Sequence, residues 1–258
     1  MSNIVFPESI QDLLKRLVNN FRETLGENLV GFYVHGSLAM GCFNPLTSHV
    51  DFLVVVHVPL DVETKRAIFA FTLELAKDAP EKGLEFSIVL RQYTQHFVFP
   101  TPFELHLSPA WYDGSSSGEI DLTPLRTDPD LAAHFMITRI FGCCLFGEPI
   151  AVVFGEVPEQ HYWAALVYDL EGILPEIGLN PVYNILNVCR IIAYKQEKRV
   201  LSKLEGGRWG LEHLEPAYHP LIQQALDVYQ AKTPQSVTWE QNLLTRFAAE
   251  AKPLKSAT

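Results

Sequence analysis

The sequence has few of the features that mark a membrane protein or a secreted one. None of its apolar runs approaches the roughly 18–20 residues that a membrane-spanning helix requires, and its start, MSNIVFPESIQDLLKRL, has no basic segment followed by an apolar core. We therefore expect no signal peptide and no membrane partner. The 258 residues include only four cysteines, none in a Cys-x-x-Cys pair, which favours a reducing, cytoplasmic location.

Basic residues are also in short supply. The chain has 20 lysines and arginines against 30 aspartates and glutamates, a formal net charge of −10, and no basic stripe of the kind that binds DNA or RNA. We therefore expect no nucleic-acid partner. The acidic balance suits either the attraction of a cationic small molecule or a simple need for solubility, and both remain open.

The apolar patterns that are present predict an α+β protein in two parts. In the first part, apolar residues at helical spacing predict helices over residues 7–26 and 61–79. Short apolar runs predict strands over residues 29–36, 49–58 and 84–93. Beyond a Gly-, Ser-, Asp- and Pro-rich stretch, only helical patterns follow, over residues 129–147, 159–174, 181–196, 204–214, 219–232 and 238–254. We predict a sheet domain over residues 1–120 and an all-helical domain over residues 121–258. Cys143 and Cys144 are then helix core rather than a redox pair.

The stretch GSLAMGCFNPLTSHVDFLVVV, residues 36–56, carries the most informative chemistry. Gly36 allows a tight turn and the close approach of a ligand. Ser37 offers a hydroxyl and a backbone N–H at the start of a helix, where anions bind. A Gly-Ser pair between a strand and a helix is common, so it indicates a phosphate site only weakly on its own.

Two acids, Asp51 and Glu85, each interrupt an apolar strand. Residues two apart in a strand face the same side, so His49 and Asp51 share one face. A carboxylate among apolar neighbours is costly unless it binds something. If the two strands are neighbours, the acids converge and predict a Mg²⁺ site beside a phosphate. The alternative is that they pair with Arg or Lys at the edge of the sheet.

Together these motifs resemble the DNA polymerase beta-like nucleotidyltransferases, and more closely the aminoglycoside adenylyltransferases that modify streptomycin and spectinomycin. The similar segments follow in order along almost the whole chain: YVHGSLAMGCFNPL, SHVDFLVVV, LEFSIV, PTPFELH, TDPDLAAH, ILNVCR and LSKLEGGRWGL. The resemblance implies a mixed-sheet nucleotidyltransferase domain and a helical bundle that closes a cleft for ATP and an acceptor alcohol. It also implies Mg²⁺, or Mn²⁺, as cofactor and adenylyl transfer to a cationic, aminoglycoside-like molecule.

The same resemblance assigns roles to individual positions. It implies that Asp51 holds the metal and that Glu85 contacts it and acts as general base on the acceptor hydroxyl. The implied nucleotide-binding residues are Gly36, Ser37, Ser48, Arg190 and Lys203. Without the resemblance, Arg190 would be interpreted as one partner of an ion pair.

His49 departs from the family pattern, which has an aspartate at this position. Imidazole suits Zn²⁺, Ni²⁺ or Cu²⁺ better than Mg²⁺, and the change removes one negative charge, so we expect weaker Mg²⁺ binding and slower chemistry. Three explanations remain open. One is that the protein is a catalytically degenerate nucleotide- or drug-binding protein. Another is that the enzyme works with Mn²⁺ or a softer metal, and the third is that the substitution is particular to this sequence.

The acceptor side departs as well. Drug-modifying relatives carry acids before the helix that corresponds to PVYNILNVCR, where this chain has Asn180, with Glu176 nearby as a substitute. Trp111 lies near a family tryptophan that contacts the drug. We assign these three residues to the acceptor without naming the drug.

Several other polar residues have two interpretations. In TDPDLAAH, Asp128, Asp130 and His134 have a spacing close to that of metal ligands, yet Asp128 also suits a helix start. His35 either touches phosphate or simply ends a strand. Glu104 and His106 share one strand face, which we expect near the cleft.

Overall fold

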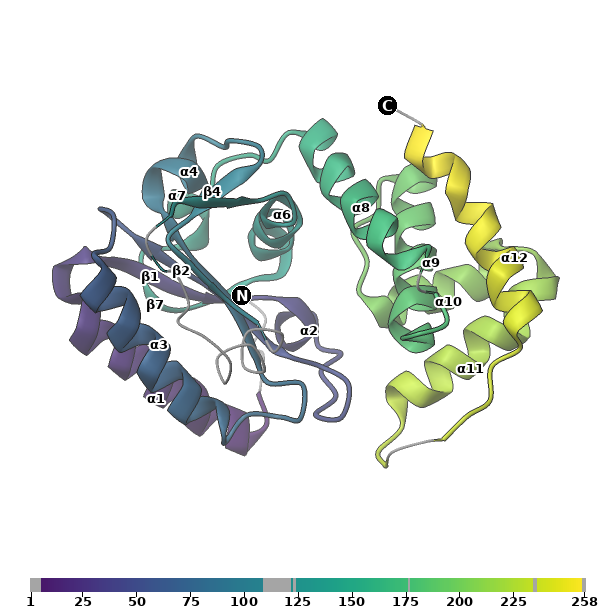
Figure 1. Ribbon diagram of the computed structural model, residues 1–258, viewed down its shortest axis with the longest axis horizontal. Helices are drawn as coiled ribbons and strands as arrows, with labels where there is room; N and C mark the ends of the chain where they lie inside the picture. Colours follow the sequence, from purple (N-terminus) through teal and green to yellow (C-terminus); the bar gives the residue numbers. More distant parts are fainter. Residues whose placement is uncertain (1–5, 109–121, 123, 176, 234–235, 257–258) are drawn as a thin grey trace. The chain divides into compact units, whose positions relative to one another are not determined.

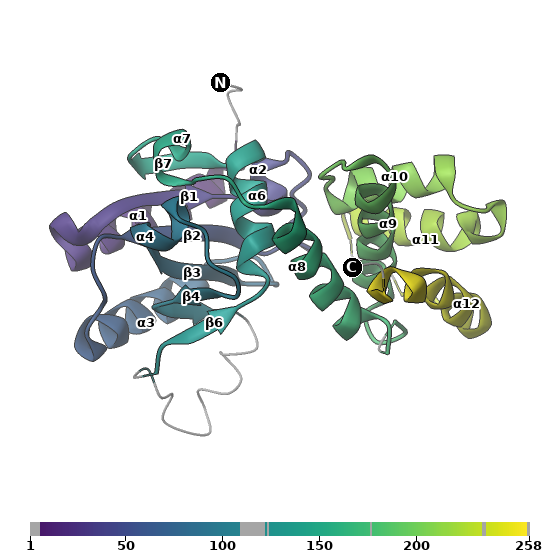
Figure 2. The same cartoon turned by 90° about the horizontal axis from the view of Figure 1, so that it is seen from above.

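The computed structural model describes residues 6–108, 122, 124–175, 177–233 and 236–256. It divides into two compact units, Met1–Tyr162 and Trp163–Thr258. A mixed sheet with helices in the first unit and helices in the second confirm the predicted α+β class (Figures 1 and 2). The division differs from the predicted one after residue 120, because Cys143–Gly147 forms a further strand, β7, that pairs with β1.

The first unit is built on a five-stranded sheet in the order β5-β3-β2-β1-β7. The strands are β1 (Leu29–Val34), β2 (Val50–Val56), β3 (Leu84–Leu90), β5 (Leu105–Leu107) and β7 (Cys143–Gly147). Strands β2 and β3 are parallel, and the other neighbours are antiparallel. Two short strands, β4 (Thr101–Phe103) and β6 (Arg126–Asp128), form a separate antiparallel pair.

Helices α1 (Glu8–Leu25) and α3 (Val62–Ala76) lie side by side on one face of this sheet (Figure 1). Both were predicted. The apolar residues of α1 recur at helical spacing and are buried. Helix α3 begins at the predicted cap, where the Asp61 side chain accepts a hydrogen bond of 2.7 Å from the Thr64 N–H.

Aromatic rings form the centre of the core beneath these helices. Phe32, Phe52 and Phe86, on three neighbouring strands, stack with ring centroids 4.5 Å and 4.7 Å apart. Phe21 of α1 meets the stack from above, with its centroid 6.0 Å from that of Phe52. Because a slip of one residue would turn a ring to the other face of the sheet, the stack holds the register of the strands.

Three helices of the first unit lie on the other face of the sheet (Figure 1). They are α4 (Arg91–Gln95), α6 (Leu131–Phe141) and α7 (Ile150–Val153). Phe154, just after α7, packs its ring 5.0 Å from that of Tyr33 on β1 and 5.5 Å from that of Phe135 on α6. These contacts tie the segment after residue 120 to the sheet.

The prediction that Cys143 and Cys144 are helix core is wrong. Helix α6 stops at Gly142, and the next five residues form β7. Both thiols are free and half-buried, and burial raises the pKa of each. Neither is therefore a reactive thiolate, because the thiolate form is disfavoured at neutral pH.

The second unit contains only helices among its described residues, as the pattern predicted. They are α8 (Glu159–Ile173), which begins just before the division, α9 (Pro181–Glu197), α10 (Lys203–His213), α11 (His219–Gln230) and α12 (Gln241–Ala251), with 3-10 turns at Pro216–Tyr218 and Lys252–Ser256. A further 3-10 turn, Gly26–Asn28, follows α1 in the first unit. None of the helices in the described ranges is long and apolar enough to cross a membrane.

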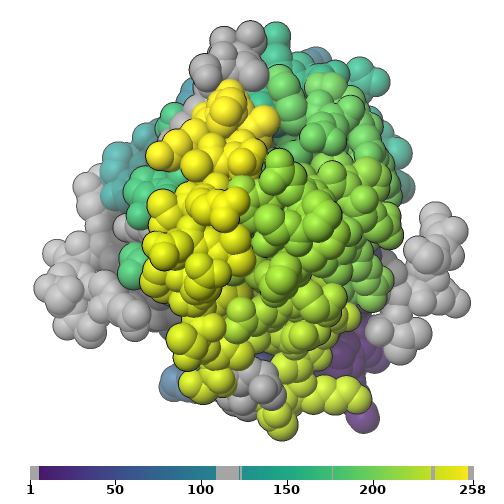
Figure 3. All heavy atoms as spheres, turned by 90° about the vertical axis from the view of Figure 1, so that its right-hand side faces the viewer, coloured from purple at the N-terminus to yellow at the C-terminus, as the bar shows by residue number. Residues whose placement is uncertain are grey.

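Helix α9 is the centre of the second unit. Helix α10 packs closely against it because Gly206 has no side chain, and a Cβ there would lie 2.8 Å from the Cβ of Arg190. Ser202 and Glu205 form a reciprocal cap at the start of α10. The yellow α12 lies beside the light green segments that precede it (Figure 3), and the Tyr218 hydroxyl donates a 3.0 Å hydrogen bond to Glu250.

A buried ion pair links α3 to the loop between β4 and β5. Lys65 Nζ lies 3.2 Å from Glu104 Oε2, and the two side chains are only 7% and 5% exposed. The same carboxylate oxygen accepts a 3.0 Å hydrogen bond from the Leu60 N–H. Glu104, which we expected near the cleft, is therefore committed to a structural pair.

This pair predicts a large loss of stability when one partner is removed. Lys65→Met leaves a buried carboxylate without its counter-charge, so we expect the free energy of unfolding to fall by about 3–5 kcal/mol in urea denaturation. The double variant Lys65→Met, Glu104→Gln should regain much of this loss. Lys77→Met, which breaks an exposed pair with Glu74, is the control and should cost under about 1 kcal/mol. A Lys65→Met protein as stable as the wild type contradicts the assignment.

Candidate active site

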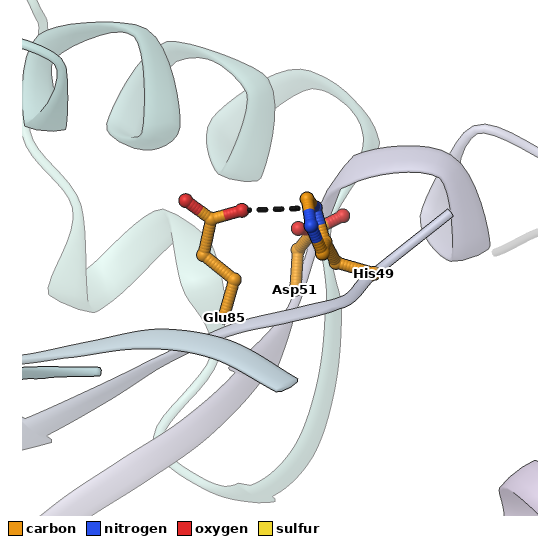
Figure 4. Close-up of side chains that lie close together, drawn as sticks. All are labelled: His49, Asp51 and Glu85. Carbon is orange, nitrogen blue, oxygen red and sulfur yellow. Dashed lines mark ion pairs between the residues drawn. The ribbon is translucent and has the colours of Figure 1, made fainter. Parts of the chain in front are cut away.

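The parallel pairing of β2 with β3 brings the two strand acids together. Asp51 lies directly opposite Glu85 in the register, and His49 precedes the first residue of β2. The three side chains point toward one another (Figure 4), with ligand atoms that all lie within 4.8 Å of each other. Among the described residues they form the one group of three or more His, Cys, Asp or Glu side chains with metal-ligand spacing.

His49 and Glu85 are in direct contact. His49 Nδ1 lies 3.1 Å from Glu85 Oε2, and the side chains are 30% and 26% exposed. Burial on its own raises the pKa of Glu85, but the hydrogen bond from His49 and the charges of His134, His49 and His106 outweigh it and lower this pKa to about 2. Glu85 is therefore a carboxylate at neutral pH, within reach of solvent.

The glycine turn is built around Asp51. Helix α2 (Gly36–Ala39) follows β1 after one residue, and Gly36 has a positive φ of 62°. A Cβ on Gly36 would lie 2.0 Å from Asp51 Oδ2, so a side chain there would collide with the carboxylate. The buried Ser37 hydroxyl has no hydrogen-bond partner among the described residues. The turn and Asp51 thus form one unit, with a polar atom still to be satisfied.

A second layer of histidines lies behind this turn. The rings of His35, which is 3% exposed, and His134 of α6 lie 4.8 Å apart. His134 Nε2 is 3.1 Å from Asp130 Oδ2, and although burial lowers the pKa of His134, the Asp130 charge and hydrogen bond raise it to about 10. Burial, and then the charge of His134, lower the pKa of His35. The pair is therefore one imidazolium and one neutral ring.

The TDPDLAAH motif has two effects: its aspartates form hydrogen bonds at the start of α6, and Asp130 stabilises the protonated form of His134. Asp128 accepts a 2.9 Å hydrogen bond from the Asp130 N–H, but α6 begins at Leu131 with Asp130 at its N-cap, so the prediction that Asp128 caps a helix opened by Pro129 is wrong. Sequence reasoning did not connect His134 to the site. The available signal was the spacing of four residues between Asp130 and His134, which places both on one face of a helix.

His106 also lies on the face of the sheet that carries Glu85. His106 Nδ1 is 2.9 Å from Ser87 Oγ, on the neighbouring strand β3. Ser87 is two residues from Glu85, so the two side chains share a face. Burial lowers the pKa of His106, and the Glu85 charge opposes this effect. His106 is therefore close enough to Glu85 for the two charges to influence each other.

Among the other residues predicted from the sequence, Ser48 lies in the loop before His49, and Asn180 lies at the start of α9. The hydroxyl of Ser48, a buried residue, accepts a 3.2 Å hydrogen bond from the Asn44 N–H and so closes the loop before His49. Asn180 is exposed at the start of α9, and its side chain makes no capping hydrogen bond. Trp111 and Glu176 lie outside the described residues.

Arg190 and Lys203 belong to one cluster in the second unit. Arg190 lies 3.9 Å from Asp169 Oδ2, and the Tyr183 hydroxyl donates to the other oxygen of this carboxylate at 3.4 Å. Lys203 Nζ lies 4.6 Å above the Tyr183 ring. The ion-pair interpretation of Arg190 thus has a partner in Asp169, at a long distance, and the two cations share one set of neighbours.

Comparison with known proteins covers both units. Residues 152–253 match the family described as aminoglycoside adenylyltransferase, C-terminal domain. Aminoglycoside (3'') (9) adenylyltransferase from Klebsiella pneumoniae is 26% identical over 222 residues, which are 84% of each chain. The protein of the same description from Rhizobium radiobacter is 24% identical over 240 residues, 89% of this chain and 88% of that one.

The fold has a counterpart among solved structures. The crystal structure of spectinomycin adenyltransferase AAD(9) from Enterococcus faecialis, with ATP and spectinomycin, superposes with a TM-score of 0.80 at 18% identity and covers 95% of this chain and 99% of its own. The resemblance that the motifs indicated is therefore confirmed, and these relatives support the predicted enzyme class: over most of its length, this chain is similar to aminoglycoside adenylyltransferases.

Proposed function

We propose that the protein transfers the adenylyl group of ATP to a hydroxyl of a cationic, aminoglycoside-like small molecule. The observation that carries this proposal is the convergence of Asp51, Glu85 and His49 beside the Gly36 turn. It occurs on a fold that matches an adenyltransferase solved with ATP and spectinomycin. Nucleotidyl transfer needs positioning and charge neutralisation more than covalent chemistry, and this arrangement would supply both with a divalent cation bound to it.

Each group of this chain has a role in the proposed reaction. The backbone of Gly36 and Ser37 binds phosphate, and the unpartnered Ser37 hydroxyl is available to the same ligand. A divalent cation held by Asp51, Glu85 and His49 would neutralise phosphate charge. Glu85 accepts the proton of the acceptor hydroxyl. From the second unit, Arg190 and Lys203 are the proposed contacts of the triphosphate. Support for these last two roles is the resemblance alone.

His134 adds a charge that the family motifs did not indicate. Its imidazolium, held by Asp130, lies against His35, the residue that precedes the phosphate turn. We propose that it is a fixed positive charge behind the turn, where it lowers the cost of bringing a triphosphate to an acidic site.

The contact between His49 and Glu85 favours a second candidate function. The His49 hydrogen bond is one of the interactions that lower the pKa of Glu85 to about 2, and a carboxylate with so low a pKa is a weak base. A nucleotide- or drug-binding protein without transfer activity on the same scaffold is therefore the alternative. The two functions are separated by measuring transfer and binding on the same preparation.

The base assignment predicts the effect of Glu85→Gln. Transfer of label from ATP to a panel of aminoglycosides and spectinomycin should fall by about 10²–10⁴-fold. The amide has the shape of the carboxylate, so the thermal midpoint should change little. Equal transfer by wild type and variant removes Glu85 from the mechanism. Label transfer by neither protein, with ATP bound by both, favours the alternative function.

If His49 is replaced by aspartate, the family residue, we predict a gain in transfer activity. His49→Asp removes the donor that holds Glu85 and adds a negative charge, so the pKa of Glu85 rises and the site gains an oxygen ligand. We expect label transfer in the presence of Mg²⁺ to increase by about tenfold or more. His57→Asp, the same substitution at an exposed histidine just after β2, is the matched control and should show no gain. A slower His49→Asp enzyme contradicts the proposal.

The charge on His134 predicts a pH-dependent stability. Because folding raises the pKa of His134 from about 6.5 to about 10, protonated His134 stabilises the folded protein. This contribution is complete below pH 6.5, the pKa in the unfolded chain, and disappears as the pH rises through about 10. Asp130→Asn removes the partner that raises this pKa. Its deficit in free energy of unfolding relative to wild type, about 1–2 kcal/mol at pH 6, should shrink steadily to near zero at pH 10. A deficit that stays constant over this range contradicts a charged His134.

A further inference from the structure

We infer that His49, Asp51 and Glu85 form a mononuclear site that selects a transition-metal ion of the Zn²⁺ or Co²⁺ type over Mg²⁺. The inference concerns the site of the proposed function and rests on that function for its catalytic meaning. Ion binding itself can be measured without nucleotide or acceptor, so the two claims can fail separately.

The spacing of the donor atoms is that of ligands on one ion. Two donors that each lie about 2.1 Å from a metal, at an angle of roughly 95°, are about 3.1 Å apart. The distance between His49 Nδ1 and Glu85 Oε2 is 3.1 Å, and an oxygen of Asp51 lies within 4.8 Å of both. The three side chains face the same space, so their donor atoms can serve a single ion (Figure 4).

The kind of donor decides which ion is favoured. Mg²⁺ requires a nearly ideal octahedron of oxygen atoms, often with several waters. This site offers one imidazole nitrogen and two carboxylates, whose summed charge is −2 rather than the −3 of three carboxylates. Imidazole suits Zn²⁺, Co²⁺ and Ni²⁺, and the affinity of such mixed sites rises along the first transition series. The residues present therefore fit a transition-metal ion and fit Mg²⁺ poorly.

The surroundings keep the site open and rigid. The ladder between β2 and β3 fixes the backbone of both carboxylates, while the side chains of His49 and Glu85 remain about a quarter to a third exposed. A Cβ on Gly36 would lie 2.0 Å from Asp51 Oδ2, so the glycine lets this carboxylate pack against the turn, which fixes its position. Three protein ligands with an open fourth position are the usual form of catalytic zinc sites.

The competing explanation is an ion pair in place of the metal. A protonated His49 would also lie near 3.1 Å from Glu85, with no ion bound. The two explanations differ in what the protein does when metal is offered, because a stable ion pair takes up no ion and does not distinguish Zn²⁺ from Mg²⁺.

The experiment titrates chelator-treated, full-length protein with Zn²⁺, Co²⁺ and Mg²⁺ alone. Calorimetry should give one tight equivalent of Zn²⁺, with a dissociation constant at least about tenfold lower than that of Mg²⁺. The visible spectrum of the Co²⁺ form reports the nitrogen ligand directly. His49→Ala should weaken Zn²⁺ binding by about 100-fold. His49→Asp should restore Mg²⁺ binding and remove the spectral signature of the imidazole.

His57→Ala is the matched control, because this exposed histidine follows the opposite end of β2. Its Zn²⁺ binding should equal that of the wild type. Zn²⁺ binding that survives His49→Ala unchanged, or equal affinity for Zn²⁺ and Mg²⁺, overturns the inference. Tight, His49-dependent Zn²⁺ binding without label transfer under any ion supports it and counts against the proposed function. Label transfer with Mg²⁺ alone, without a Zn²⁺ site, does the reverse.

Discussion

The parallel, in-register pairing of β2 with β3 is the constraint on which the rest of the first unit depends. Asp51 faces Glu85 in this register, and one residue further along Phe52 faces Phe86. The acids emerge on one face of the sheet and the stacked rings on the other. A slip of one residue would break the stack and separate the carboxylates at the same time. The hydrophobic core thus stabilises the geometry of the polar site as well as the fold.

Around these carboxylates the described part of the chain places three histidines. His49 touches Glu85, His106 lies on the neighbouring strand, and His134 lies behind the glycine turn, held charged by Asp130. Imidazoles are compact, and their charge depends on their neighbours. The electrostatics of the site are therefore set by short contacts within the first unit, and they combine two carboxylates with several nearby rings.

The sequence predicted the meeting of the two strand acids better than it predicted the boundary between the two units. A single acid within an apolar strand is a strong signal, so the convergence of Asp51 with Glu85 and the strands that carry them could be foreseen. Residues 143–147 could not, because a short apolar run after a helix has the same pattern whether it continues the helix or forms a strand. The partner of Glu104 is Lys65, and the contact of His35 with His134 joins β1 to α6. Such pairings depend on tertiary structure, which local periodicity does not encode.

The position of His49 just outside β2 has an evolutionary consequence. The strand begins at Val50, whose N–H is bonded to the Gly83 carbonyl, and the ladder and ring stack hold from there onward. The side chain of residue 49 contacts Glu85, and in the proposed function it binds the metal, but the residue forms no rung of the sheet. The metal chemistry of this scaffold can therefore drift by substitution at one position while natural selection on folding barely registers the change, so descendants of one ancestor can come to use different ions.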